Sequence, residues 1–147
     1  MASRPALKTI LRDSGEVRSF YEAYRKVRWQ KKSPTEAQGF WTIVVGTGLT
    51  LNDVQTTGKL SDVSREVLDI MWTVQREDGG WRWPDCDYAP LEIDDHYGVT
   101  LAAIAVASAP ENYAASKAAA PGYKKLLSWL KKNQPNLAHQ KGMMLWL

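Results

Sequence analysis

Residues 75–106 read QREDGGWRWPDCDYAPLEIDDHYGVTLAAIAV. In chain order, this stretch holds a Gln, a Gly-Gly-Trp turn, a group of carboxylates and a long apolar segment. Asp94 and Asp95 stand directly before the apolar residues, where short acidic side chains commonly cap a helix. The stretch therefore predicts a turn that leads into a buried helix, and the rest of the chain reads as scaffold around it.

Apolar spacing along the chain from residue 35 predicts only helices. Segments that are apolar on nearly all sides alternate with segments that carry one apolar stripe and one charged face, and no strand-like alternation competes. The expected helices, buried and amphipathic in turn, are 35–52, 63–75, 95–108, 122–133 and 137–147. In 122–133, we expect Leu126, Leu127 and Leu130 to face the core opposite a group of Lys. The predicted fold class is all-α.

Two motifs carry a resemblance to a known family. Gln75, Gly79 and Trp81 match the QW motif, a Gln followed a few residues later by Gly-x-Trp. Residues 91–95, LEIDD, stand where the same family has the acid motif Asp-x-Asp-Asp. The chain thus resembles part of a squalene-hopene cyclase-like protein, a terpenoid cyclase. The resemblance implies an α/α toroid, a ring of alternating inner and outer helices, and 147 residues would form an incomplete ring.

The predicted organisation has two parts. Residues 1–34 form an N-terminal helical segment, and residues 35–147 form a partial toroid with one QW-type repeat. Residues 143–147 are an apolar run without a cap behind them, so we expect the last helix to be cut in mid-course. An incomplete ring implies self-association or the remainder of a longer chain as its partner.

Composition and charge limit which kinds of partner and which location are expected for the chain. The single Cys86 excludes an internal disulfide, and no run of 18 apolar residues exists to span a membrane. The net charge is +3, with basic residues concentrated toward both ends. We interpret these as solvated helix faces and predict no nucleic-acid binding, while peripheral attachment to a membrane stays open. The expected location is cytoplasmic or membrane-peripheral, since 1–10 lacks the apolar core of a signal peptide.

The resemblance also implies a chemistry for the acid motif. Terpenoid cyclases of class II begin cyclisation by protonating an alkene or epoxide, which requires a strong carboxylic acid that is still protonated. The family's proton donor corresponds to Asp94, with Glu92 and Asp95 as flanking acids, and the substrate would be a long isoprenoid. Neither a cofactor nor a metal ion is expected. An N-terminal helix position lowers the pKa of Asp94, whereas three neighbouring carboxylates raise the pKa of the group.

Aromatic side chains near the motif are candidates for a substrate cavity, because their faces stabilise carbocations. We expect four of them in this role: Trp41, Trp83, Tyr88 and Tyr97. The sequence departs from the family pattern at Glu92, which is longer than the family's Asp by one methylene. The family's acid also contacts a His from another part of the chain, and neither His96 nor His139 is assigned to that place.

Several alternatives remain open. Asp94 and Asp95 can simply cap a helix, in which case the chain is a non-catalytic helical-repeat interaction module with an ionised Asp94. A hard cation could be bound by Asp85, Asp87, Glu92, Asp94 and Asp95, although their spacing fits no known loop. A protein prenyltransferase-like zinc site would have to use Asp85, Cys86, Asp87 and His139. The Asp-Asp-x-x-Asp motif of class I terpene synthases lacks its last acid here, and we reject it.

Overall fold

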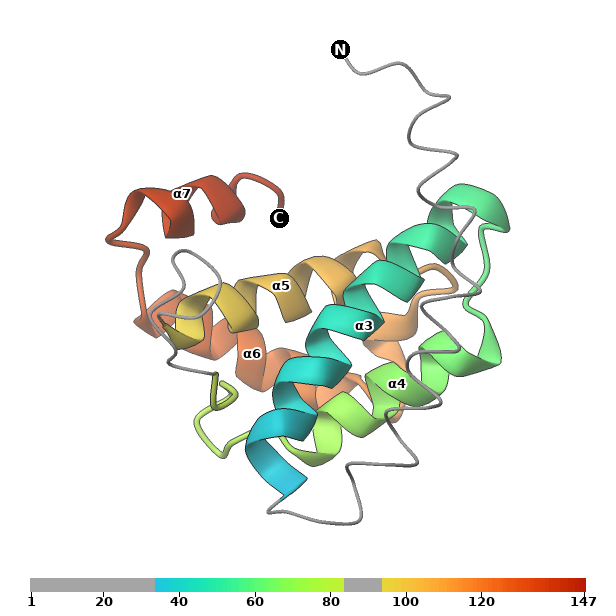
Figure 1. The fold of residues 1–147 in the computed structure, drawn as a ribbon, viewed down its shortest axis with the longest axis horizontal. Helices are drawn as coiled ribbons and strands as arrows, with labels where there is room; N and C mark the ends of the chain where they lie inside the picture. The colour runs from blue at the N-terminus through green and yellow to red at the C-terminus, as the bar shows by residue number, and fades with distance from the viewer. Residues whose placement is uncertain (1–33, 84–93) are drawn as a thin grey trace. The chain divides into compact units, whose positions relative to one another are not determined.

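The computed structural model describes residues 34–83 and 94–147 (Figure 1). The chain divides between Ser33 and Pro34 into two units, so the description covers the second unit without residues 84–93. All regular elements in this part are helical, which confirms the all-α class. They are α3 (Pro34–Thr56), α4 (Asp62–Thr73), α5 (Asp95–Ser108), the short 3₁₀-helix η1 (Tyr113–Ala115), α6 (Ala120–Lys132) and α7 (Ala138–Met144). The ring of the toroid stays a prediction, and the helical segment expected over 1–34 lies outside the described residues except for Pro34.

Local signals explain most helix ends. The Ser61 hydroxyl accepts a hydrogen bond from the Ser64 backbone N–H and caps α4. The helix α3 was expected to end near residue 52, but it continues for about one more turn. It ends where Gly58, at φ +67°, donates its N–H to the Asp53 carbonyl oxygen. A glycine with positive φ that bonds back into the last turn is a common helix terminator.

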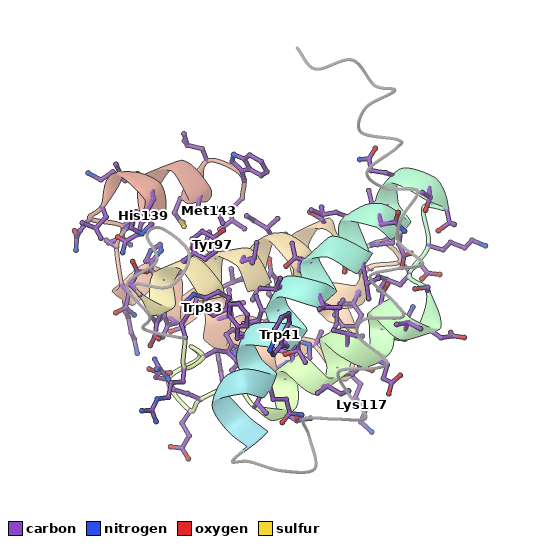
Figure 2. The ribbon with its side chains drawn as sticks, in the orientation of Figure 1. Trp41, Trp83, Tyr97, Lys117, His139 and Met143 are labelled. Atoms are coloured by element: carbon purple, nitrogen blue, oxygen red, sulfur yellow. The ribbon has the colours of Figure 1, made fainter. Side chains whose placement is uncertain are left out.

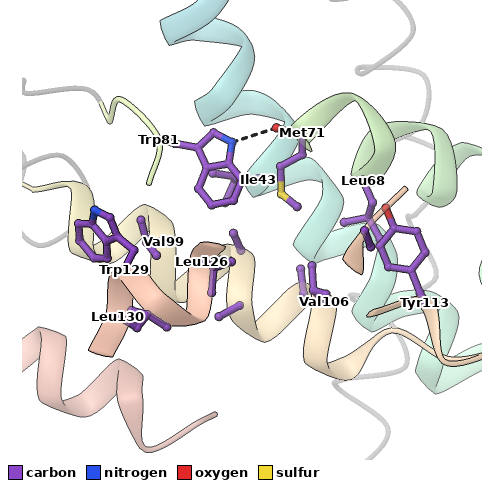
Figure 3. Close-up of a cluster of buried hydrophobic side chains, with 14 of the residues drawn as sticks. Ile43, Leu68, Met71, Trp81, Val99, Val106, Tyr113, Leu126, Trp129 and Leu130 are labelled. Carbon is purple, nitrogen blue, oxygen red and sulfur yellow. Dashed lines mark hydrogen bonds between the residues drawn. The ribbon is translucent and has the colours of Figure 1, made fainter. Parts of the chain in front are cut away.

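The helix α5 lies at the centre of the packing (Figure 1). It contacts α3 on one side and also packs against α6 and α7, whereas α4 packs against α3. Four of its apolar side chains, Val99, Ala102, Ala103 and Ala105, are fully buried. Because α5 is apolar on every side and rich in Ala, neighbouring helices can approach it closely from several directions. Figure 3 shows the resulting core, in which side chains from α3, α4, α5 and α6 meet.

The amphipathic helices turn one face toward this core. On α6, Leu126 and Leu130 are buried beside Trp129, while Leu127 is 47% exposed. The expectation that Leu127 faces the core was therefore wrong. Residues 126 and 130 are four apart and share one helix face, whereas 127 lies about 100° further round the helix and beyond the edge of that face.

Candidate functional site

Asp94 occupies the position before the first residue of α5. Its backbone is extended, and its Oδ1 accepts a hydrogen bond of 3.0 Å from the Tyr97 N–H in the first turn. Its Oδ2 lies 3.0 Å from Nε2 of His139, which belongs to α7. One carboxylate thus caps α5 and also holds α7, because it uses one oxygen for each helix.

These contacts favour the ionised form of the Asp94 carboxyl. Partial burial by itself would raise the pKa of this carboxyl, but hydrogen bonds from His139, the Tyr97 N–H and Gln140 together hold the pKa below its ordinary value. A carboxylate that accepts several hydrogen bonds is stabilised in its ionised form. This geometry therefore favours a carboxylate at neutral pH over the protonated acid that a proton donor needs.

Asp95 binds a different part of the chain from the one that Asp94 binds. Its Oδ2 pairs with Nη1 of Arg76 at 2.6 Å, and its Oδ1 accepts the backbone N–H of Trp83 at 3.0 Å. Arg76 also contacts Asp78, with 3.0 Å between Nη2 and Oδ2. Asp95 thereby connects the first turn of α5 to the turn that follows α4.

The sequence pattern did not predict the role of Arg76. Although burial works in the opposite direction, its hydrogen bonds to Asp78 and Asp95 raise the pKa of the guanidinium. The available signal was its place beside Gln75 of the QW motif and two residues before an acid. That pattern alone also fits a solvated charge, because nothing local indicates the partner at Asp95, 19 residues further on.

The QW residues connect α4 to α6. The Gln75 side-chain amide donates to the carbonyl oxygens of Gly79 at 2.9 Å and Gly122 at 3.0 Å. Trp81 is 1% exposed and donates its Nε1–H to the Met71 carbonyl oxygen at 2.9 Å, near the end of α4 (Figure 3). Gly79 has φ +98°, and a Cβ on it would overlap the Lys125 carbonyl of α6.

Three of the four predicted cavity aromatics lie in one row of rings. Trp83 contacts Tyr97 at 6.0 Å between ring centroids, and Phe40 lies between Trp83 and Trp41 at 4.9 Å and 5.3 Å. Trp83 is only 6% exposed, and a Cβ on Gly98 would overlap its ring. Figure 2 shows Trp83 and Tyr97 near the start of α5, and Trp41 on α3. These rings contact one another as packed side chains.

A second histidine, His96, lies two residues after Asp94 in the first turn of α5. His96 is 5% exposed, and its Nδ1 lies 3.2 Å from the Thr100 hydroxyl. Its ring centroid is 5.8 Å from that of Trp129. Burial lowers the pKa of His96, so the ring is neutral at physiological pH. His96 is therefore part of the core, and His139 is the histidine that meets the motif acid.

Two predicted site residues, Glu92 and Tyr88, lie outside the described residues. Within 34–83 and 94–147, no group of three or more His, Cys, Asp and Glu side chains is arranged to hold a metal ion. Among the helices of this same part of the chain, none combines the length and apolar character needed to cross a membrane.

Comparison of the chain with family models, curated proteins and solved structures found no match.

Proposed function

We propose that this chain is a non-catalytic helical-repeat module of the squalene-hopene cyclase-like type. The observation that carries the proposal is that Asp94 and Asp95, the motif acids, hold helices and turns together through hydrogen bonds. Both carboxylate oxygens of Asp94 and both of Asp95 accept hydrogen bonds from scaffold groups. A proton donor has to present an O–H to its substrate, whereas these oxygens are engaged as acceptors.

The packing order supports a partial toroid as the architecture of the module. α3, α5 and α7 pack side by side in chain order, and α4 and α6 each pack against the helix that precedes them. This is the order expected of inner helices with outer helices added between them. In such a module, the QW residues and the two acids hold successive helices together, and the outer surface would bind partners.

A titration of Asp94 tests the proposal. We expect NMR of its carboxyl carbon, followed between about pH 3 and pH 8, to give a pKa below the ordinary value of about 3.9. The His139→Ala variant should move this pKa upward, because it removes one stabilising donor. A pKa well above 3.9 that falls in the Asp95→Asn variant would overturn the module and point to a coupled acid site.

A second candidate is protonation-initiated cyclisation of a long isoprenoid with Asp94 as the acid. The Asp94–His139 contact favours it, because the resembled family pairs its acid with a His from elsewhere in the chain. The test is incubation of the chain with a long isoprenoid alkene or its epoxide, followed by mass spectrometry of the products. Cyclic product that is absent with Asp94→Asn would support this candidate, and an unchanged substrate would count against it.

A further inference from the structure

The exposed face of α6 carries an unusual concentration of one charge. Lys124, Lys125, Lys131 and Lys132 are all exposed on this helix. None of these four forms an ion pair with another residue of the described part of the chain. We call these four side chains the α6 basic face.

No nearby acid in the sequence offsets this charge. Residues 101–147 contain six Lys and one acid, Glu111. Glu111 is itself engaged, since its Oε2 lies 3.0 Å from Nη2 of Arg65 on α4. Asp78, in the turn that packs against α6 at Lys125, is paired with Arg76. The charge of the α6 basic face is therefore available to an external anionic partner.

An apolar side chain lies at the edge of this face. Leu127 is 47% exposed and stands three residues after Lys124 and four before Lys131, so the three side chains are neighbours on the helix surface. Leu137, just beyond the end of α6, is 48% exposed. The opposite side of α6 is fixed in the core by Leu126 and Leu130, so the helix presents this mixed surface outward.

We propose that the α6 basic face binds the surface of an anionic lipid bilayer. Lys side chains near such a surface each contribute to attachment, and an exposed Leu among them can enter the headgroup region. Because the attraction is mainly electrostatic, attachment should weaken steeply with salt. This inference does not depend on the state of Asp94.

The composition of the face favours lipid over nucleic acid. Residues 101–147 contain no Arg, the side chain that most often reads base edges with two hydrogen bonds. Proteins that bind single strands stack bases on exposed aromatic rings. On α6, Trp129 is buried and Tyr123 is partly buried, so neither ring is a free stacking platform.

Vesicle cosedimentation of the full 147-residue chain tests the proposal. The vesicles are phosphatidylcholine alone, and phosphatidylcholine with about one third phosphatidylserine, each at low and at high salt. We expect binding only to the second kind and only at low salt. The variant Lys124→Gln/Lys131→Gln should bind at least tenfold more weakly, because each lost Lys corresponds to roughly a fivefold change in partition.

The matched control is Lys59→Gln/Lys117→Gln, which removes the same charge from exposed positions outside α6. We expect it to bind much more tightly than the α6 variant, and Leu127→Ser to bind more weakly than wild type at equal charge. Circular dichroism should show an unchanged fold in all variants, because the substituted side chains are exposed. Equal losses in the two double variants, equal binding to both kinds of vesicle, or tighter binding to a single-stranded oligonucleotide at the same salt would each overturn the proposal.

Discussion

Asp94 and Asp95 are adjacent in the sequence, yet they stabilise different parts of the molecule. Asp94 joins the start of α5 to α7, and Asp95 joins it to the turn after α4. The peptide between them is extended on the Asp94 side, which directs the two side chains to different partners. Substitutions at the two positions should therefore have separable effects.

Replacing Asp94 separates its capping role from its charge. Asp94→Ala should lower the free energy of unfolding by about 1 kcal/mol through the lost cap alone. Asp94→Asn keeps a side-chain acceptor for the Tyr97 N–H and should lose less. Urea unfolding of the three proteins measures the difference. Equal stability of the Ala variant and the wild type would show that the cap contributes nothing.

Two helical glycines provide a matched pair. Gly98→Ala forces a Cβ into the Trp83 ring, and overpacking of this kind costs typically 1–3 kcal/mol. At Gly48, no side chain and no other segment of the described residues comes within 4 Å of an added Cβ, so Gly48→Ala should stabilise the helix by about 1 kcal/mol. Chemical denaturation of both variants measures this. The prediction fails if Gly98→Ala is as stable as Gly48→Ala.

For single residues, the sequence predicts contacts that are local in the chain better than contacts between distant positions. The cap at Asp94 follows from an acid directly before an apolar run, and the structure has it. The partner of Asp94 does not follow, because His139 is 45 residues away and only the packing of α7 on α5 brings the two together. For the same reason, the sequence does not indicate Asp95 as the partner of Arg76.

Among the elements, the turn that follows α4, residues 74–83, is held by side-chain bonds to backbone carbonyls. Gln75 and Trp81 together donate to three such carbonyls, at Met71, Gly79 and Gly122. Met71 lies in the last turn of α4, where carbonyls often lack an intrahelical partner, so the Trp81 N–H supplies a donor there. The turn thereby fixes α6 relative to α4.

Gln75→Glu tests this link at almost constant shape. A carboxylate cannot donate to the carbonyl oxygens of Gly79 and Gly122, so the two hydrogen bonds are lost and like partial charges face each other. We expect a loss of about 2 kcal/mol in the free energy of unfolding and faster amide exchange in α6. Gln55→Glu, at an exposed position on α3, is the control and should change little. Similar losses for the two variants would contradict the link.

Most of the helices were predictable from the sequence. The reason also explains why the exposure of Leu127 was not predicted. The bounds expected for 95–108 match α5, because a cap and an uninterrupted apolar run define both ends. The apolar stripe of α6 was predicted one residue too wide at Leu127. Periodicity gives the direction of a buried face, but the width of the face depends on the neighbouring helices, which the sequence does not specify.

For the whole molecule, two kinds of group make stability depend on pH. Burial lowers the pKa of His96, so the unfolded chain binds a proton below about pH 6.5 while the folded chain resists it. The pKa values of Asp94 and Asp78 are also lowered. Their contribution is complete above about pH 3.9 and is lost as the pH falls through the folded pKa values.

We therefore expect acidification to reduce the free energy of unfolding in two stages. His96→Gln should remove most of the first stage, which begins near pH 6.5, and Asp94→Asn should reduce the second, which begins near pH 3.9. Urea unfolding at a series of pH values between about 8 and 3 measures both stages. A stability curve that is flat down to about pH 4 would contradict the buried, neutral state of His96.

The order in which the helices pack affects how the chain can fold during its synthesis. α3 packs extensively with α4 and α5, and α5 with α6 and α7, so these partners are never more than two helices apart along the chain. Contacts between near neighbours in sequence favour rapid folding. During synthesis, α3, α4 and α5 can assemble a first core before α6 and α7 have left the ribosome. Each later helix then finds its docking surface on α5 already formed, so this part of the chain can grow from its N-terminal side as it is translated.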